Sequence, residues 1–311
     1  LLDIPKGPHE VAYAQALART LVDPDGKLET QDFWQSSAAS LLTAAILHVL
    51  YAEKDKSLAG VLHFLATPGK SLRHQLELLR QTEHDPTLEQ FFVTPGKKDE
   101  TPFHPAIALE AAKLLDLAPE TLTGIVATAR SRLSLFLDPI VAENTRRHDF
   151  SLAGLGDPQR PTSIYLVLPA RDLGRLSGLL RLFLQALSYQ ATGELATETL
   201  PDGRLRPGAP TPRRLLLVLD ELAAVGKLDL ISRQLAYLRG YGLQILAAVQ
   251  TANQLYDLYG QHESVRGNLA YLVVFPSTEQ KTAEEISKLL GDQTLAVDSK
   301  SRSATGTLFA S

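Results

Sequence analysis

Leu215-Leu216-Leu217-Val218-Leu219-Asp220-Glu221 is a run of five apolar residues that ends in two adjacent carboxylates. A continuous apolar run is typical of a parallel β-strand that helices cover on both faces. Ligands of such sheets bind where the strands end, a place where acid groups often carry chemistry. Two interpretations are open. Either Asp220 holds Mg²⁺ and Glu221 polarises an attacking water, or the strand stops at a solvated acidic turn.

The next apolar segment brings a third polar side chain to the same edge. After Glu221 come a loop, a predicted helix over Leu228–Arg239 and a predicted strand over Gln244–Val249, which Gln250 follows. Because neighbouring parallel strands end side by side, we expect Gln250 to lie near the two carboxylates. There it can sense the γ-phosphate of ATP; the alternative is that it only caps the next helix.

The rhythm of the sequence divides the chain into two regions. Residues 1–148 form a predicted all-α domain, and residues 149–311 a predicted α/β domain in which short strands alternate with helices around a parallel sheet. The predicted helices of the first region are Val11–Val22, Gln35–Tyr51, Leu58–Ala66, Leu72–Gln81, Pro105–Leu115 and Glu120–Leu137. The predicted strands of the second are Ser163–Leu168, Leu215–Leu219, Gln244–Val249 and Ala270–Phe275, with helices over Asp172–Gln190, Leu228–Arg239, Asn253–Leu258 and Thr278–Leu290.

Composition narrows the class of protein. The 311 residues are 44% hydrophobic and 21% charged, which is ordinary for a globular chain, and the net charge of −4 argues against a surface that is basic all over. Without cysteine there is no disulfide, zinc–cysteine site or thiol nucleophile. The longest mostly apolar stretch, Ala38–Tyr51, is too short to cross a bilayer. The chain contains no methionine and begins at Leu1, so we interpret it as a fragment, and an upstream membrane anchor stays open.

Nucleic acid, if it is a partner, must be met by local basic patches. The arginines that could contact DNA phosphates or a partner protein, or that are simply solvated, are Arg130, Arg132, Arg146, Arg147, Arg171, Arg175 and Arg181.

The longer sequence around the carboxylates carries a family resemblance. The segment LLLVLDELAAVGKLDLISRQLAYLRGYGLQILAAVQTANQLYDLYG, residues 215–260, resembles the Walker B to glutamine-motif region of TraG-like coupling proteins, the conjugative ATPases of type IV secretion systems. Residues 138–155, 162–184 and 284–294 extend the resemblance. It implies an α/β fold, the parallel sheet of a RecA-like P-loop NTPase motor, into which an all-α domain is inserted.

The resemblance also implies a mechanism and partners. ATP and Mg²⁺ would sit between the subunits of a homo-hexamer, with Asp220 on the metal, Glu221 activating water and Gln250 reporting the γ-phosphate. Arg239 matches an arginine that reaches the neighbouring subunit's nucleotide, although a cation at a helix C-terminus explains it equally well. The cargo would be single-stranded DNA with a relaxase, or an effector protein, received by the all-α domain. It would pass to secretion-channel components at the cytoplasmic side of the bacterial inner membrane.

One departure from the family pattern is the absence of a Walker A motif, GxxxxGK[ST]. Gly69-Lys70-Ser71 does not qualify, because Phe64 stands where the first glycine is required and a predicted helix, not a strand, precedes it. We attribute the absence to a phosphate loop that lies before Leu1, and expect this fragment alone to bind nucleotide poorly.

Two other functions stay open. The chain could be a cargo-recruitment module without catalysis, which a natural start at Leu1 would support. It could also be a chromosomal DNA translocase or helicase of the same superfamily, which failure to bind a relaxase would favour.

Overall fold

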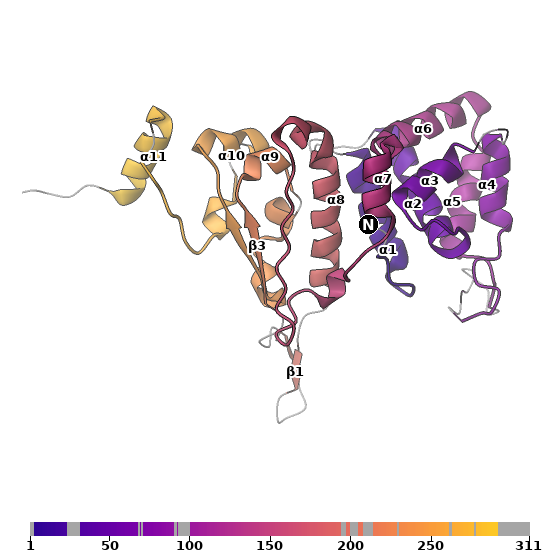
Figure 1. The fold of residues 1–311 in the computed structure, drawn as a ribbon, viewed down its shortest axis with the longest axis horizontal. Helices are drawn as coiled ribbons and strands as arrows, with labels where there is room; N and C mark the ends of the chain where they lie inside the picture. Colours follow the sequence, from indigo (N-terminus) through magenta and orange to yellow (C-terminus); the bar gives the residue numbers. More distant parts are fainter. Residues whose placement is uncertain are drawn as a thin grey trace, which may run out of the picture.

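The computed structural model describes residues 3–23, 32–67, 69, 71–89, 92, 100–193, 197–199, 205–207, 214–228, 230–260, 263–276 and 278–291. Figure 1 shows a group of helices on one side, a small sheet on the other and helix α8 between them. The α-helices are α1 (Glu10–Val22), α2 (Phe33–Ala52), α3 (Leu58–Leu65), α4 (Leu72–Gln81), α5 (Pro105–Leu115), α6 (Pro119–Arg132), α7 (Pro139–Arg146), α8 (Leu173–Ala191), α9 (Leu222–Val225), α10 (Ala252–Tyr259) and α11 (Gln280–Leu290). The strands are β1 (Thr197–Thr199), β2 (Leu205–Pro207), β3 (Leu215–Leu219) and β4 (Leu243–Ala247).

Helix α2 is the centre of the helical group and contacts α1, α3, α5 and α6. A capping box forms the N-terminus of α2: the backbone amide of Gln35 donates to Asp32 Oδ1 (2.8 Å), and the backbone amide of Asp32 donates to Gln35 Oε1 (3.3 Å). From Ala38 to Leu50 nearly every side chain is buried, as expected for a helix that neighbours surround. By length and composition alone α2 could also cross a membrane, a test that the core helix of a soluble protein passes equally.

The sheet half is built on one parallel pair of strands. Strand β3 pairs with β4 in the register Leu215↔Leu243 through Leu219↔Ala247. The buried face of this pair packs on Leu222, Leu230, Ile231 and Leu238, which form a second apolar core. Strands β1 and β2 form a separate antiparallel pair between α8 and β3.

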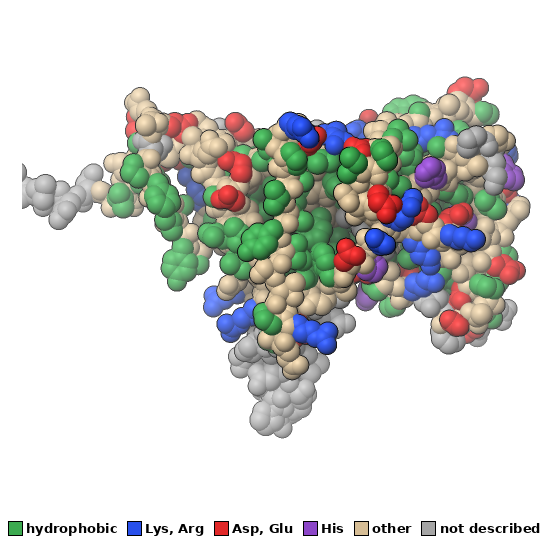
Figure 2. Space-filling view, in the orientation of Figure 1, with side chains coloured by type: hydrophobic (Ala, Val, Ile, Leu, Met, Phe, Trp, Pro, Cys, Tyr) green, Lys and Arg blue, Asp and Glu red, His purple; other side chains and the backbone are tan. Residues whose placement is uncertain are grey.

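The prediction of strands over Ser163–Leu168 and Ala270–Phe275 is wrong. Neither segment pairs with another strand among the described residues, and Tyr165 and Val273 are 85% and 75% exposed. An apolar run indicates a tendency to be buried, but a strand also needs a neighbour for its amides and carbonyls. The outer face of β3 and β4 is exposed as well, and Figure 2 shows hydrophobic side chains gathered over this half of the molecule.

The predicted helix over Leu228–Arg239 is also wrong in its form. The described residues make a π-helical turn at Leu230–Gln234 and a 3₁₀ turn at Leu238–Tyr241. Leu228, Leu230 and Ile231 are all buried in the second core. The Ile231 and Ser232 amides both donate to the Leu228 carbonyl (3.1 and 3.0 Å), and the Tyr237 amide donates to the Gln234 carbonyl (2.8 Å). Bonds to the third and the fourth residue back are thus mixed, in place of the continuous series of an α-helix.

Helix α8 joins the two halves. Leu182, Ala186 and Leu187 belong to the core of the helical group, whereas Leu184 belongs to the core under the sheet. The rings of Tyr13 in α1 and Tyr189 in α8 stack with centroids 4.5 Å apart. Because one helix contributes to both cores, a domain boundary between residues 148 and 149 stays a prediction.

A chain of buried histidines crosses the helical group. His48 Nδ1 lies 3.1 Å from His84 Nε2, and the His104 amide donates to His84 Nδ1 at 3.5 Å. His104 Nε2 lies 3.0 Å from Glu10 Oε1. Burial lowers the pKa of His48 to about 4; burial, together with the neighbouring His48 and His104, lowers the pKa of His84 to about 3. Burial raises the pKa of Glu10, but hydrogen bonds from His104, Tyr51 and the Gly7 amide outweigh it and lower the net pKa.

These pKa shifts predict an acid-sensitive core. His48 and His84 are neutral in the folded protein but take up protons in the unfolded chain. The free energy of unfolding therefore has its full value above pH 6.5 and falls as the pH drops. Between pH 6.5 and 5 we expect a loss of about 2 kcal/mol for each histidine, measured by urea unfolding. Below about pH 4.5 protonation of Glu10 adds to the loss. His48→Gln should make the pH dependence shallower, and the exposed control His148→Asn should not; equal slopes in all three proteins would contradict this account.

Candidate functional site

The parallel pairing of β3 and β4 brings the ends of both strands to one edge. Beyond the strands, the Ala248 amide donates to the Leu219 carbonyl (2.9 Å) and the Leu222 amide donates to the Ala248 carbonyl (3.0 Å). Asp220 and Glu221 follow β3 directly, and Gln250 stands three residues after β4. The backbone bonds therefore fix these three residues on the same rim of the sheet.

At this rim Glu221 and Gln250 touch. The Gln250 side-chain amide donates to Glu221 Oε2 at 2.9 Å. The other oxygen, Glu221 Oε1, is buried and has no hydrogen-bond partner among the described residues. A carboxylate with one oxygen hydrogen-bonded and the other without a partner can accept a proton or a hydrogen bond from a ligand.

The start of α10 shows that Gln250 does not cap the helix with its side chain. Thr251 is the N-cap residue and forms a capping box with Gln254. Gln254 Oε1 in turn accepts a hydrogen bond from the backbone amide of Gln250 at 2.7 Å. Thr251 and Gln254 were not among the residues predicted from the sequence, although their spacing, T-x-x-Q, is that of a capping box. The side chain of Gln250 is thereby left for Glu221.

Asp220 is exposed beside Glu221 and is the available metal ligand at the rim. The described residues contain no group of three or more His, Asp or Glu side chains that could hold an ion by themselves. Mg²⁺ commonly takes one or two carboxylates and completes its shell with water and phosphate oxygens. The hard oxygen donors of Asp220 and Glu221 fit such a partial site.

Arg239 lies at the opposite end of the sheet. It is exposed in the 3₁₀ turn that precedes β4, whereas Gln250 follows the same strand. A five-residue strand is roughly 16 Å long, so Arg239 cannot reach Glu221 of its own chain. Of the four predicted site residues, the structure brings together Asp220, Glu221 and Gln250 and leaves Arg239 apart.

Arg181 supports the loop behind the carboxylates and is not a DNA contact. It is only 6% exposed, and its Nε donates to the Val225 carbonyl at 2.8 Å, at the end of α9. Gly226 follows with φ +82°, and a Cβ atom there would lie 2.7 Å from Arg181 Nη2. The Arg181 side chain of α8 thus fixes the end of the short helix α9, which begins directly after Glu221.

Other arginines that could contact DNA are already used within the chain. Arg130 Nε donates to the Leu65 carbonyl (2.9 Å), and Arg175 Nη1 donates to Asp138 Oδ2 (2.6 Å). Arg146 lies near Asp55 and Glu143, while the Arg171 side chain is exposed beside Asp172. In addition, Ser71 caps α4 by accepting from the His74 amide (3.2 Å); Lys70 lies outside the described residues.

Comparison with known proteins identifies relatives of the whole chain. A family model described as "Type IV secretory system Conjugative DNA transfer" matches residues 1–311. The conjugal transfer protein TraG of Escherichia coli is 33% identical over 294 residues, which are 92% of this chain and 43% of TraG. The chain therefore spans less than half the length of this curated relative.

Solved structures show the same fold. Plasmid coupling protein TrwB in complex with the ATP analogue ADPNP superposes with a TM-score of 0.59, at 24% identity, over 91% of this chain and 58% of TrwB. TrwB in complex with ADP and Mg²⁺ gives the same TM-score at 20% identity, over 91% of this chain and 58% of TrwB. Over the matched part, the observed helices and small parallel sheet thus have the fold of TrwB.

The packing of Arg181 against Gly226 generates a stability prediction. Gly226→Ala should lower the free energy of unfolding by about 1–3 kcal/mol, because alanine disfavours this φ and its Cβ would collide with the guanidinium. Gly174→Ala, in the first turn of α8 with open space around its Cβ position, is the matched control and should be neutral or slightly stabilising. Urea unfolding measures both; equal effects would refute the tight contact.

Proposed function

Because this chain belongs to the type IV secretory system conjugative DNA transfer family, we propose that it is part of an ATP-driven coupling protein that moves DNA into a secretion channel. The observation that carries the proposal is the contact between Gln250 and Glu221 at the carboxyl rim of a parallel sheet. Relatives of known structure hold ADPNP, or ADP with Mg²⁺, which supports nucleotide as the ligand.

In the proposed reaction the three rim residues have different tasks. Asp220 holds Mg²⁺, which spreads the negative charge of the phosphates when it is bound. Glu221 Oε1 orients a water and accepts its proton as the water oxygen bonds to the γ-phosphorus and the bond to the ADP oxygen breaks. Gln250 holds Glu221 Oε2 and donates to the γ-phosphate when its amide turns toward the nucleotide.

The phosphate-binding loop of the proposed motor lies outside this chain. The chain has no GxxxxGK[ST] sequence, so its own residues supply the acid half of the site and not the phosphate cradle. The exposed apolar face formed by Leu216, Val218 and Leu246 supports this division, because parallel sheets are ordinarily covered on both sides. We therefore expect this chain alone to hydrolyse ATP poorly.

The helical group is the proposed all-α insertion of the motor and the receiver of cargo. Its first helix, α1, lies against α8, so the chain leaves and re-enters the region beside the sheet. This return supports an insertion that corresponds to the predicted all-α domain, residues 1–148. The proposed cargo is single-stranded DNA with a relaxase, or an effector protein, and the proposed assembly is a homo-hexamer at the cytoplasmic side of the bacterial inner membrane.

Glu221→Gln in the full-length protein tests the proposed chemistry. The amide keeps the size of the side chain but cannot accept the proton of the water, so ATP should still bind while turnover falls about 10²- to 10⁴-fold. Glu284→Gln, an exposed carboxylate of α11, is the control and should retain full turnover. Measured ATP hydrolysis that is unchanged in Glu221→Gln would remove Glu221 from this role.

Arg239→Ala tests action between subunits. Because Arg239 is far from its own rim, we propose that it reaches the nucleotide of a neighbouring subunit, where its loss should lower turnover about 10³- to 10⁵-fold. Mixing Arg239→Ala with Glu221→Gln subunits should restore part of the ATP hydrolysis, since some sites then combine an intact Glu221 with an intact Arg239 from the neighbour. If no mixing ratio restores hydrolysis, Arg239 does not act in trans.

A further inference from the structure

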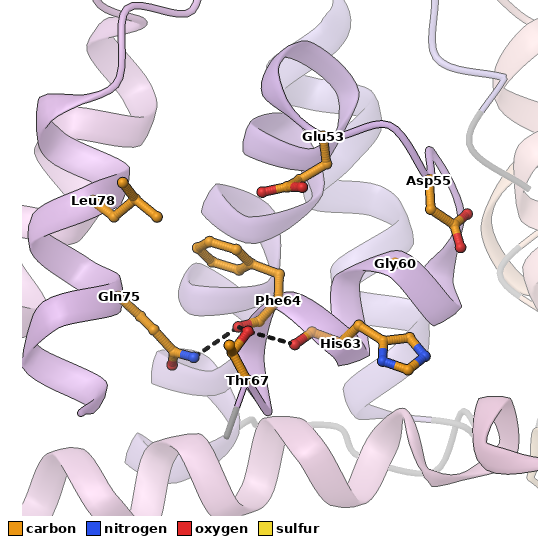
Figure 3. Close-up of a pocket in the computed structure, with 8 residues that line it drawn as sticks. All are labelled: Glu53, Asp55, Gly60, His63, Phe64, Thr67, Gln75 and Leu78. Atoms are coloured by element: carbon orange, nitrogen blue, oxygen red, sulfur yellow. Dashed lines mark hydrogen bonds between the residues drawn. The ribbon is translucent and has the colours of Figure 1, made fainter. Parts of the chain in front are cut away.

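A cavity in the helical group lies apart from the carboxylate rim. It has a volume of about 310 Å³ and opens between the end of α2, the α2–α3 connection, α3 and α4. Phe64 and Leu78 form its apolar walls, and Gln75 and Thr67 lie at its base (Figure 3). This is the volume of roughly ten waters, enough for one long side chain of a partner.

One end of the cavity is acidic because of the local sequence Glu53-Lys54-Asp55-Lys56. Glu53 has an extended backbone, and burial alternates along the stretch. Glu53 and Asp55 are partly buried and line the cavity, whereas Lys54 and Lys56 are exposed and do not line it. Alternation thus places both carboxylates among the residues that line the cavity and leaves both lysines outside it.

The two carboxylates differ in how far they are already engaged. Asp55 Oδ1 accepts a hydrogen bond from Ser57 Oγ (2.7 Å), and Asp55 Oδ2 lies 3.6 Å from Arg146 Nε. Glu53 makes no ion pair with a lysine or arginine among the described residues. In Figure 3 its carboxylate reaches over the Phe64 ring toward the side of Leu78. Glu53 is therefore the acid most available to a ligand.

A buried histidine points at this available acid. His84 Nδ1 accepts from the His104 amide, so His84 Nε2 carries its hydrogen and donates to His48 Nδ1. His48 Nε2 must then carry a hydrogen of its own. That atom is buried, has no hydrogen-bond partner among the described residues and lies 3.6 Å from Glu53 Oε1. The orphan N–H is therefore a buried hydrogen-bond donor beside the acidic end of the cavity, and an acceptor there would satisfy it.

We propose that this cavity binds an arginine side chain of a partner protein. The inference rests on the proposed function, in which the helical group receives protein cargo, and it names the side chain that such cargo presents. The methylene stem would pack on Leu78 and Phe64, and the guanidinium would lie over the Phe64 ring. Its planar fork matches the two oxygens of the Glu53 carboxylate better than the point charge of a lysine does.

The first experiment measures binding to this 311-residue chain. The probes are the peptide acetyl-Gly-Ser-Arg-Ser-Gly-amide, the same peptide with neutral citrulline or with lysine in place of arginine, and free agmatine. Binding is followed by the NMR signals of the Leu78 methyl groups. We expect the arginine peptide to bind at least about tenfold more tightly than the citrulline and lysine peptides, and agmatine, which carries the same stem and guanidinium, to bind as well.

Matched variants locate the site. Glu53→Gln should weaken the arginine peptide at least about tenfold, whereas Glu77→Gln, which removes a carboxylate from α4 outside the cavity, should leave its affinity within about twofold. Three results would overturn the proposal: equal binding of the arginine and citrulline peptides, binding of the lysine peptide as tight as that of the arginine peptide, or equal losses in the two variants. Absence of Leu78 shifts at any peptide concentration would do the same.

A second readout separates this inference from the proposed motor. In the full-length protein, Glu53→Gln should reduce transfer of a protein cargo while ATP hydrolysis stays at the level of the unmodified protein. Unchanged transfer would defeat the arginine site and leave the motor standing. Loss of ATP hydrolysis in Glu221→Gln alone, with the arginine peptide still bound, would uphold the motor and the site independently.

Discussion

The parallel pairing of β3 with β4 is the constraint on which the candidate site depends. It aligns the ends of the two strands, so that Asp220 and Glu221 after β3 lie on the same rim as Gln250 after β4. Helix α8 then supports the rim from behind through Arg181, which holds the carbonyl of Val225. The capping of α10 by Thr251 and Gln254 leaves the Gln250 side chain to Glu221. Each of these contacts narrows where the two side chains can lie.

The helical group depends on a different constraint, the burial of polar side chains around α2. His48 and His84 are neutral and hydrogen-bond to each other, and His104 continues the row of buried side chains to Glu10. This row of side-chain contacts extends from Glu10 in α1 to Glu53 at the end of α2. The same arrangement that costs stability in acid directs one N–H toward the cavity, so folding and the proposed recognition share their residues.

The sequence was most informative where local patterns are complete. Apolar spacing and Pro or Gly boundaries predicted α1 to α6, and the five-residue run before Asp220 predicted β3 correctly. Strands over Ser163–Leu168 and Ala270–Phe275 were predicted from the same kind of run, but a strand also needs a partner that no local pattern reveals. Arg181 looked like a surface cation because sequence alone does not show that α8 is buried between two cores. The cavity at Glu53 needs the approach of α4, which only tertiary structure provides.

The most direct test is a structure of the full-length protein with Mg²⁺ and the non-hydrolysable analogue ADPNP. We expect Asp220 to hold the Mg²⁺, directly or through a water. We also expect the γ-phosphate to lie within hydrogen-bond reach of Gln250 and a water to lie on Glu221 Oε1. A nucleotide bound away from this rim, or strands β3 and β4 that do not end side by side, would refute these roles of the rim residues.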